Sequence, residues 1–404
     1  MKNEKNQSNR ITVGLFNDSF FPMTDGVISV VDNYARNLIK YADVIVFAPK
    51  YHGKEFDDSS LPYKVVRCKS IKVPFLDYEV SLPFFDRKYK KELNNCKLDI
   101  VHIHSPFTIG KTGVKYAKKR NIPSIATMHS QFKQDIYKVI KNEFLSRKIN
   151  SFLIRLFNKC DECYAVNKKL AYIFHEDYGY KTLPEVLENA TEFKPLEDIK
   201  KEIINKKHNI KNDEKVFLFV GRLNTLKNIL FIVDALKIVK EKQPNLKFKM
   251  LFVGTGNDKD KLVKKIEENK LSNEVILCGK VTNREELACY FARADLFLFP
   301  SKYDSSSIVQ IEAASQKTPT LFLKNTVTSS SVIDKINGFL ANDSCLDYAD
   351  KIIEIIKNDE LFKNVGLNAF NDLYITWDDK IKEVYDLYIK KINKYKGDVL
   401  CIKN

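Results

Sequence analysis

The sequence predicts an α/β fold made of two doubly wound domains, each with a parallel sheet. The chain has 404 residues, and a single hydrophobic core stops growing at roughly 250–300 residues, so two domains are expected. Short apolar segments of strand length alternate with amphipathic helical segments, which is the pattern of βαβ units. This alternation occurs in two series, and a polar stretch with few apolar residues separates them.

The first series begins close to the amino terminus. Residues 11–17 are expected to form a buried strand, a turn follows over residues 21–26, and residues 27–41 have the apolar spacing of a helix. Each further strand is short and apolar, as expected of a strand covered on both faces. These strands are expected at residues 44–49, 64–67, 100–104, 124–127 and 162–166.

The second series follows residues 187–214, which are rich in Glu, Lys and Asn and are expected to link the two domains. Ligands of doubly wound sheets bind beyond the carboxyl ends of the strands. The residues that follow each strand are therefore the candidates for a functional site. The strands of this series are expected at residues 216–220, 249–253, 275–277, 296–299 and 320–323.

Bulk composition excludes several classes of protein. With 44% hydrophobic and 29% charged residues the chain is globular, and no apolar run reaches the ~18 residues that span a bilayer. The polar residues 1–10 do not resemble a secretory signal, so a cytoplasmic protein is expected. The eight cysteines lack the rhythm of a disulfide framework or a zinc site. Cys160 and Cys163 form one CxxC pair and are expected to be ordinary reduced thiols.

Positive charge is concentrated in one part of the chain. The net charge is +15, and residues 101–160 contain twelve Lys or Arg against two acidic residues. Such a field favours anionic partners: nucleic acid, phosphorylated ligands or an acidic membrane surface. No recognised nucleic-acid-binding module accompanies the charge, so a phosphorylated ligand or a membrane is expected and nucleic acid is not.

The loop after the strand at residues 216–220 carries two cations. Gly221 at the strand end would let backbone come close to a ligand. Arg222 and Lys227 stand near the start of a helix, whose amide end also favours anions. Together they fit a clamp for a diphosphate, and the alternative is two solvated charges in a surface loop.

Two further segments after strands complete the candidate site. A G-x-G turn that begins at Gly254 opens a helix, but turn geometry alone also explains two glycines, because a dinucleotide fingerprint needs a third. Residues 300–314 place Asp304 at the mouth of a strand and Glu312 about two helical turns further on, near the same face. Two acids spaced in this way would reach different parts of an elongated ligand.

Taken together, these segments resemble the retaining glycosyltransferases of family 4, which have the GT-B fold. The family pattern of the second domain reads G-R-L-x-x-x-K-[GN], then G-x-G, then P-S-x-x-E-x-F-G-x-x-x-x-E-A. Residues 99–106, residues 126–130 and the glycine loop that ends at Val27 match the family in the first domain. The resemblance covers most of the chain, from residue 11 to residue 377.

The resemblance implies a domain organisation. It implies an acceptor-side Rossmann-like domain at residues 1–190 and a nucleotide-sugar-binding Rossmann-like domain at residues 191–372, which face a central cleft. Residues 373–404 are then a helical segment that returns to the first domain. The implied partner is a nucleotide-sugar donor; no cofactor and no metal ion is implied, and the oligomeric state is left open.

The resemblance also implies roles for the donor-binding residues. Arg222 and Lys227 would hold the donor diphosphate and balance the charge on the departing nucleotide, which is electrostatic stabilisation of a leaving group. Glu312 would accept hydrogen bonds from the ribose hydroxyls. Gly254 would belong to the same donor site.

Other residues are implied to act on the sugar. Asp304 and the amides of Ser306 and Ser307 would contact the transferred sugar. From the first domain, Gly26 would let backbone approach the phosphates and His129 would lie near the sugar. His129 and Asp304 are therefore the expected catalytic residues, and the alternative for His129 is a satisfied histidine at a strand end.

Two more histidines, His102 and His104, lie on one face of the expected strand at residues 100–104. A pair of this kind can also bind a metal ion. Because the family works without a metal, we interpret the two side chains as packing or polar support.

The sequence departs from the family pattern in three places. Asp304 replaces Glu and is one methylene shorter, Ser306 and Ser307 replace Phe-Gly, and Asn189-Ala190 replaces Asn-Gly. None of these changes removes a charge, so activity is still expected. They put the identity of the donor sugar in doubt.

The basic stretch bears on the acceptor. Over residues 132–159 aromatic and aliphatic residues interleave with Lys and Arg, which is typical of a helix in a membrane interface. Residues 69–91 add aromatic residues among further cations. The alternative is a core-facing helix with a solvated cationic face.

The membrane interpretation predicts a peripheral enzyme on the inner face of the cell membrane, similar to the enzymes that glycosylate diacylglycerol. It would move a hexose from a UDP- or GDP-sugar to a lipid acceptor such as diacylglycerol, with an anionic membrane surface as partner. A second hypothesis is a transferase with a soluble acceptor that builds capsule or wall polysaccharide.

A hypothesis from another class is a non-catalytic partner subunit that binds a nucleotide sugar. The altered residues 304–307 favour it, whereas the retained Arg222, Lys227 and Glu312 argue against it. A nucleotide-sugar epimerase shares the architecture, but its motifs differ from those present.

Overall fold

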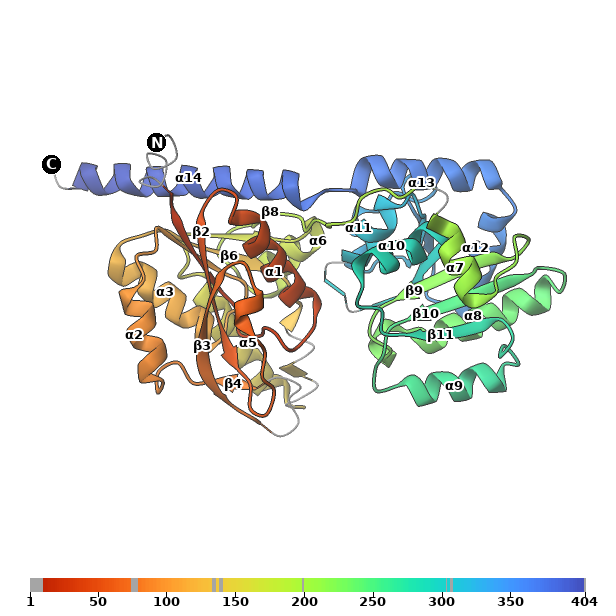
Figure 1. Cartoon of the computed structure of the whole chain (residues 1–404), viewed down its shortest axis with the longest axis horizontal. Coiled ribbons are helices and arrows are strands. Elements are labelled where there is room, and N and C mark those ends of the chain that lie inside the picture. Colours follow the sequence, from red (N-terminus) through yellow and green to blue (C-terminus); the bar gives the residue numbers. More distant parts are fainter. Residues whose placement is uncertain are drawn as a thin grey trace. The chain divides into compact units, whose positions relative to one another are not determined.

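The computed structural model describes residues 10–73, 79–132, 136–137, 141–197, 200–302, 304–305 and 308–402, the last five of these by their backbone alone. The chain forms two compact units. Unit 1 comprises Met1–Asn189 and Trp377–Asn404, and unit 2 comprises Ala190–Thr376. Each unit is a sheet with helices on its faces (Figure 1), so the expected pair of doubly wound α/β domains is confirmed.

Unit 1 has a sheet with the strand order β4-β3-β2-β1-β5-β6-β7-β8, in which only β3 and β4 pair antiparallel. The order reverses between β1 and β5, which pair in parallel. Its strands are β1 (Thr12–Phe16), β2 (Asp43–Lys50), β3 (Lys64–Ile71), β4 (Val80–Ser81), β5 (Ile100–Ile103), β6 (Ser124–Met128), β7 (Glu162–Ala165) and β8 (Glu185–Val186). Its helices include α1 (Gly26–Leu38), α2 (Arg87–Asn95), α3 (Thr108–Arg120), α5 (Glu143–Phe157), α6 (Lys168–Tyr172) and α14 (Trp377–Ile402).

Unit 2 has an all-parallel sheet with the order β11-β10-β9-β12-β13-β14, the Rossmann arrangement. The order reverses between β9 and β12. Its strands are β9 (Lys215–Val220), β10 (Phe248–Val253), β11 (Val275–Gly279), β12 (Leu296–Phe299), β13 (Thr320–Leu323) and β14 (Phe339–Ala341). Its helices include α7 (Lys201–His208), α8 (Ile229–Lys242), α9 (Lys259–Glu268), α10 (Arg284–Arg293), α11 (Ile308–Ser315), α12 (Cys345–Ile356) and α13 (Asp359–Leu373).

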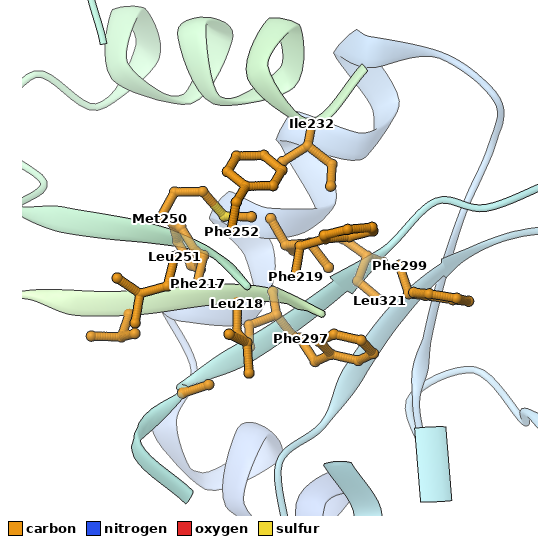
Figure 2. Packing of buried hydrophobic residues seen from close by; sticks show 14 of the residues in the cluster. Phe217, Leu218, Phe219, Ile232, Met250, Leu251, Phe252, Phe297, Phe299 and Leu321 are labelled. Carbon is orange, nitrogen blue, oxygen red and sulfur yellow. The ribbon is translucent and has the colours of Figure 1, made fainter. Parts of the chain in front are cut away.

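The core of unit 2 explains why its strands are apolar without alternation. Helices cover both faces of the sheet, so successive side chains of β9 such as Phe217, Leu218 and Phe219 are all fully buried. Figure 2 shows these side chains packed with Phe252 of β10 and Ile232 of α8. Burial of large aromatic groups on both faces gives the sheet a rigid centre, and the carboxyl ends of its strands are fixed by it.

The carboxyl-terminal helix α14 packs along α1 of unit 1 (Figure 1). Trp377 lies edge-on against Tyr34 of α1, with ring centres 5.3 Å apart, and Asp378 forms an ion pair with Lys40. Tyr388 is fully buried. The helix α14 therefore contributes side chains to the core of unit 1.

The expected linker at residues 187–214 is mostly wrong. Within this stretch α7 packs against α10 and buries Ile204 completely, and Thr191 pairs with Thr376 within unit 2. The prediction failed because a short helix needs very few apolar residues to pack, so its composition resembles that of a linker.

Of the helices that the structure describes, none combines the length and the apolar character needed to cross a membrane.

Candidate active site

The carboxyl ends of three adjacent strands in unit 2 form the candidate site. β9 and β12 pair at the point where the strand order reverses, and ligands of doubly wound sheets bind beyond the strand ends at this point. The segments after β9, β10 and β12 carry the residues that the sequence indicates. These are Arg222 and Lys227 after β9, Gly254 after β10 and Asp304 after β12, and α11 adds Glu312.

Local hydrogen bonds give the loop after β9 a defined shape. The Asn224 side chain accepts a hydrogen bond from the backbone N–H of Lys227 at 3.1 Å and closes a short turn over Thr225–Lys227. The backbone N–H of Thr225 donates to Asp258 Oδ2 at 2.8 Å, which ties the turn to the loop after β10. Arg222 is exposed at the start of the loop. Both cations of the expected clamp thus stand at the carboxyl edge of the sheet.

Lys227 and Asp304 form an ion pair between the loops after β9 and β12. Their side chains retain 24% and 19% of their surface, and the Lys227 ammonium lies 5.8 Å from the centre of the Phe299 ring. A hydrogen bond from the Asn228 side chain to the carbonyl oxygen of Pro300 at 3.3 Å joins the same two loops. The structure therefore brings together a cation and an acid that the sequence assigns to different parts of the donor.

The other oxygen of Asp304 is buried. Within the described parts of the chain Oδ2 has no hydrogen-bond partner. Ser306 and Ser307, which are expected to contact the sugar, lie outside the described residues. Their role remains a prediction.

Gly254 has a structural reason to be glycine. Its φ is +145°, and a Cβ at this position would lie 1.9 Å from the carbonyl oxygen of Gly221. A Cβ at Gly256 would lie 2.2 Å from the carbonyl oxygen of Leu223. The G-x-G turn thus lets the loops after β9 and β10 pack backbone to backbone, and the contact of Gly254 with a donor remains a prediction.

Glu312 is held by a residue that the sequence did not indicate. Its side chain retains only 4% of its surface, and its Oε1 pairs with Nη2 of Arg284, the first residue of α10. Arg284 Nε also donates to Glu192 Oε1 at 2.5 Å. No local pattern in the sequence indicates Arg284, because its two acids lie 92 and 28 residues away along the chain.

The protonation of Glu312 depends on this pair. Burial raises the pKa of Glu312 above its ordinary value, and the charge and hydrogen bond of Arg284 oppose that rise. Glu192 is a further negative charge and raises the pKa. The net direction is upward, so Arg284 is the group that favours the ionised form.

Three buried histidines lie at the carboxyl ends of β5 and β6 in unit 1. The ring nitrogens of His102 lie 2.7 Å from the hydroxyls of Tyr388 and Thr127, and His104 Nδ1 lies 3.0 Å from His129 Nε2. Burial lowers the pKa of His102 and of His129 to about 3. Both imidazoles are therefore neutral at physiological pH.

These contacts bear on the two interpretations of the histidines. The hydrogen bonds of His102 agree with a role in packing and polar support. His129 is hydrogen-bonded within the unit, as its alternative interpretation expects, and its role near a sugar remains a prediction. Among the described residues no cluster of His, Cys, Asp and Glu side chains is arranged to hold a metal ion. Cys160 and Cys163 are buried free thiols.

The loop after β1 is anchored by Asp18, which no pattern in the sequence indicated. Its carboxylate accepts hydrogen bonds from the backbone N–H groups of Ile109 and Gly110, at 2.7 and 3.2 Å, and from the Ser105 hydroxyl at 2.8 Å. It therefore caps α3 from a distance, and burial raises the pKa of Asp18. Gly26, further along the same loop, is exposed and is the first residue of α1.

An exposed surface of aromatic and cationic side chains lies on unit 1. The Lys111 ammonium of α3 lies 5.5 Å from the ring centres of both Phe84 and Phe152. Lys115 lies 4.7 Å from the ring of Phe84, and the next residue, Phe85, is 82% exposed. These contacts join the loop before α2 with α3 and α5, and we call these five residues the aromatic–cationic surface.

The helix α5 has features of both interpretations of the basic stretch, the core-facing helix and the helix in a membrane interface. One side packs into the core through apolar residues such as Leu153 and Phe157. The other side exposes Phe144 and Phe152, at 68% and 54%, with Lys148 4.5 Å from the ring of Phe144. The helix is therefore core-facing, and its outward face is both aromatic and cationic.

Comparison with known proteins matches each half of the chain to a family of glycosyltransferases. Residues 24–192 match the family described as Glycosyltransferase Family 4, and residues 200–372 match the family described as Glycosyl transferases group 1. The alpha-monoglucosyldiacylglycerol synthase of Acholeplasma laidlawii is 27% identical over 95% of this chain and 98% of the relative. The enzyme of the same name from Streptococcus pneumoniae is 25% identical over 81% of this chain and 74% of the relative.

Solved structures share the fold of the chain. The sucrose-phosphate synthase of Thermosynechococcus elongatus has a TM-score of 0.76 at 17% identity and covers 94% of this chain and 99% of that one. HepE of Anabaena, in complex with UDP and glucose, has a TM-score of 0.72 at 16% identity over 93% of this chain and 100% of that one. The chain thus belongs to the family 4 glycosyltransferases: it is a glycosyltransferase of the GT-B fold that resembles the diacylglycerol glucosyltransferases.

Proposed function

We propose that this glycosyltransferase moves a hexose from a UDP- or GDP-sugar to a membrane lipid such as diacylglycerol, retains the anomeric configuration and needs no metal ion. The observation that carries the lipid acceptor is the aromatic–cationic surface of unit 1. Two relatives that cover most of the chain are named as alpha-monoglucosyldiacylglycerol synthases. Retention of configuration rests on the family resemblance.

The donor would bind at the carboxyl edge of the sheet of unit 2. The leaving group is a nucleoside diphosphate, and its departure builds up negative charge. Arg222 and Lys227 supply two positive charges from the loop after β9, which is the role that a metal ion has in other transferases. Glu312 would accept the ribose hydroxyls, and Asp304 would contact the sugar. Gly254 would support the donor-binding loops.

When the donor binds, Lys227 would have two partners, Asp304 and a donor phosphate. In the structure its ammonium is paired with Asp304. An ammonium has three donor hydrogens, so Lys227 can contact a phosphate and Asp304 together. This would couple the diphosphate to the acid that is expected to contact the sugar.

The acceptor side is proposed to work at a membrane surface. The exposed rings of Phe85 and Phe152 can enter the interface, whereas Lys111 and Lys115 can pair with anionic headgroups. A surface of this kind would keep the enzyme on the cytoplasmic face of the membrane, where its lipid acceptor is concentrated. Gly26 and His129 of unit 1 are proposed to contact the donor phosphates and the sugar.

A donor panel with vesicles tests the proposal. The full chain is incubated with UDP-glucose, UDP-galactose and GDP-mannose, in the presence of vesicles of phosphatidylglycerol and diacylglycerol and with EDTA. We expect a glycolipid whose anomeric proton coupling matches that of the donor, and we expect Arg222→Ala to abolish its formation.

Each other outcome contradicts a defined part of the proposal. Transfer only to a soluble saccharide in the absence of vesicles would favour the polysaccharide alternative. Binding of a donor without hydrolysis or transfer, for every donor tested, would favour the non-catalytic partner subunit. Activity that EDTA abolishes and Mg²⁺ restores would contradict metal independence, and inversion of the anomeric centre would contradict retention.

A further inference from the structure

The guanidinium of Arg284 has three partners, all within unit 2. It pairs with the buried Glu312, it donates to Glu192 at 2.5 Å, and its central carbon lies 4.3 Å from the centre of the Phe193 ring. A guanidinium is planar and presents its donors in a fixed fork. Two acids and one aromatic face therefore define its orientation.

Glu312 requires a partner of this kind. Its side chain is 4% exposed, and an isolated carboxylate at such a site takes up a proton because burial disfavours the charged form. Glu192 adds a second negative charge nearby. Arg284 is the cation that opposes both effects.

Other charged groups on the helices packed against α11 have different partners or no effect on Glu312. On α10, Glu286 pairs with Lys207 and Arg293 pairs with Asp295. The charged groups that shift the pKa of Glu312 are Arg284 and Glu192. Glu285 of α10 is not among them, nor are the charged residues of α13. Those residues are Asp359, Glu360, Lys363 and Asp372.

We propose that Arg284 is a positioning residue of the nucleotide site, which keeps the buried Glu312 ionised and aligned to accept the two hydroxyls of a ribose. The inference rests on the proposed donor site and adds a residue to it. An ionised carboxylate only accepts hydrogen bonds and offers about four lone-pair sites, so the contact with Arg284 leaves room for a diol. A protonated Glu312 would instead carry a hydrogen on one oxygen and accept fewer bonds.

Titration calorimetry of the full chain with UDP and GDP tests this inference. Dissociation constants are measured between pH 5.5 and pH 8.5 for the wild type and for Arg284→Met. The terminal phosphate of the nucleotide itself titrates in this range, but its effect cancels in the ratio of the two constants. Nucleotides without the 2′-hydroxyl are measured in parallel.

We expect the ratio of variant to wild-type dissociation constant to rise as the pH falls. Loss of Arg284 raises the pKa of Glu312, and the ionised form that binds ribose is then lost at a higher pH than in the wild type. An opposite charge at contact distance shifts a pKa by about 1–3 units, so the ratio should reach about tenfold or more at the acidic end. The variant should also discriminate less between UDP and 2′-deoxy-UDP.

Two variants separate positioning from a general structural role. Arg284→Lys retains the charge but not the fork, and we expect it to restore part of the wild-type pH profile. Arg36→Met removes an arginine of similar exposure from an ion pair on α1 of unit 1, and we expect it to leave nucleotide binding unchanged.

The variant Glu312→Gln keeps the proposal testable if Arg284→Met does not fold. Glutamine cannot ionise, so Arg284→Met in this background leaves no uncompensated acid at this position. We expect the double variant to bind UDP as Glu312→Gln does, because Arg284 acts through Glu312. A further loss of about threefold or more would overturn the proposal.

The remaining outcomes separate this inference from the proposed function. A ratio that stays constant over the pH range, or tighter binding by Arg284→Met, would show that Arg284 does not support Glu312. Wild-type protein that binds neither UDP nor GDP would instead contradict the donor site itself.

Discussion

Replacing Phe85 with Ser should weaken binding to anionic vesicles by about tenfold. Phe85 is 82% exposed, so nearly all of its ring is free to leave water. Complete burial of a Phe side chain is worth about 1.5–3 kcal/mol. Insertion into an interface is shallow, so the lower end applies, and about 1.4 kcal/mol corresponds to a factor of ten.

The contribution of the lysines of the same surface to vesicle binding should depend on salt, unlike that of Phe85. A lysine next to an anionic membrane contributes about 1 kcal/mol, so Lys115→Gln should weaken binding by roughly fivefold at low salt. At 1 M salt the Debye length falls to about 3 Å, and this contribution is screened. The loss from Phe85→Ser should persist, because burial of the ring does not depend on charge.

Sedimentation with phosphatidylglycerol vesicles, at low and high salt, measures both effects. Leu346→Ser is the matched control for the apolar change, since Leu346 is 52% exposed on α12 of unit 2. Lys237→Gln on α8 is the control for the charge. Equal binding by the wild type and Phe85→Ser, or an equal loss in Leu346→Ser, would refute the assignment of the membrane surface to these residues.

Three further predictions concern a glycine contact between two loops, the phosphate clamp and the buried histidines. Gly254→Ala should destabilise unit 2 by about 1–3 kcal/mol in urea unfolding, because its Cβ would meet a backbone carbonyl at 1.9 Å; Gly279→Ala, where a Cβ meets nothing within 4 Å, should cost less, and equal costs would contradict the argument. Lys227→Met should weaken UDP binding by about tenfold to a hundredfold in calorimetry, since a hydrogen bond to a charged group is worth about 1.5–3 kcal/mol; an unchanged affinity would exclude Lys227 from the clamp. The imidazole NMR signals of His102 and His129 should keep their neutral shifts from pH 8 to pH 5, because their pKa is about 3, and a titration near pH 6.5 would contradict the hydrogen-bonded interior seen for them.

The fold could be predicted to the level of its strands because burial on both faces makes each strand an uninterrupted apolar run. β9 from Val216 onward and β10 from Met250 onward are of this kind, and the expected bounds of both strands differ from the observed ones by one residue. The short edge strands β4, β8 and β14 were missed. Each has two or three residues, which is too few for a periodic signal, and tertiary pairing alone defines them.

The candidate site could be predicted where its residues follow a strand in sequence. Lys227 and Asp304 fall into this class, and the structure pairs them. Arg284 does not, because it pairs with acids that are 92 and 28 residues away, on segments that no local pattern connects. Asp18 was not predicted for a similar reason, since it caps a helix that begins 90 residues later. Contacts of this kind are decided by the packing of elements, and a single sequence does not contain a signal for them.

The two ion pairs of the site differ in a way that follows from their chemistry. Lys227 and Asp304 are both partly exposed, and an ammonium on a flexible stem can exchange or share partners at little cost. Glu312 is buried, and Arg284 is fixed by three contacts, so this pair is expensive to break. We therefore expect the first pair to rearrange when a diphosphate arrives and the second to remain as it is. Asp304 would then share Lys227 with the diphosphate, whereas Glu312 would keep its pairing with Arg284.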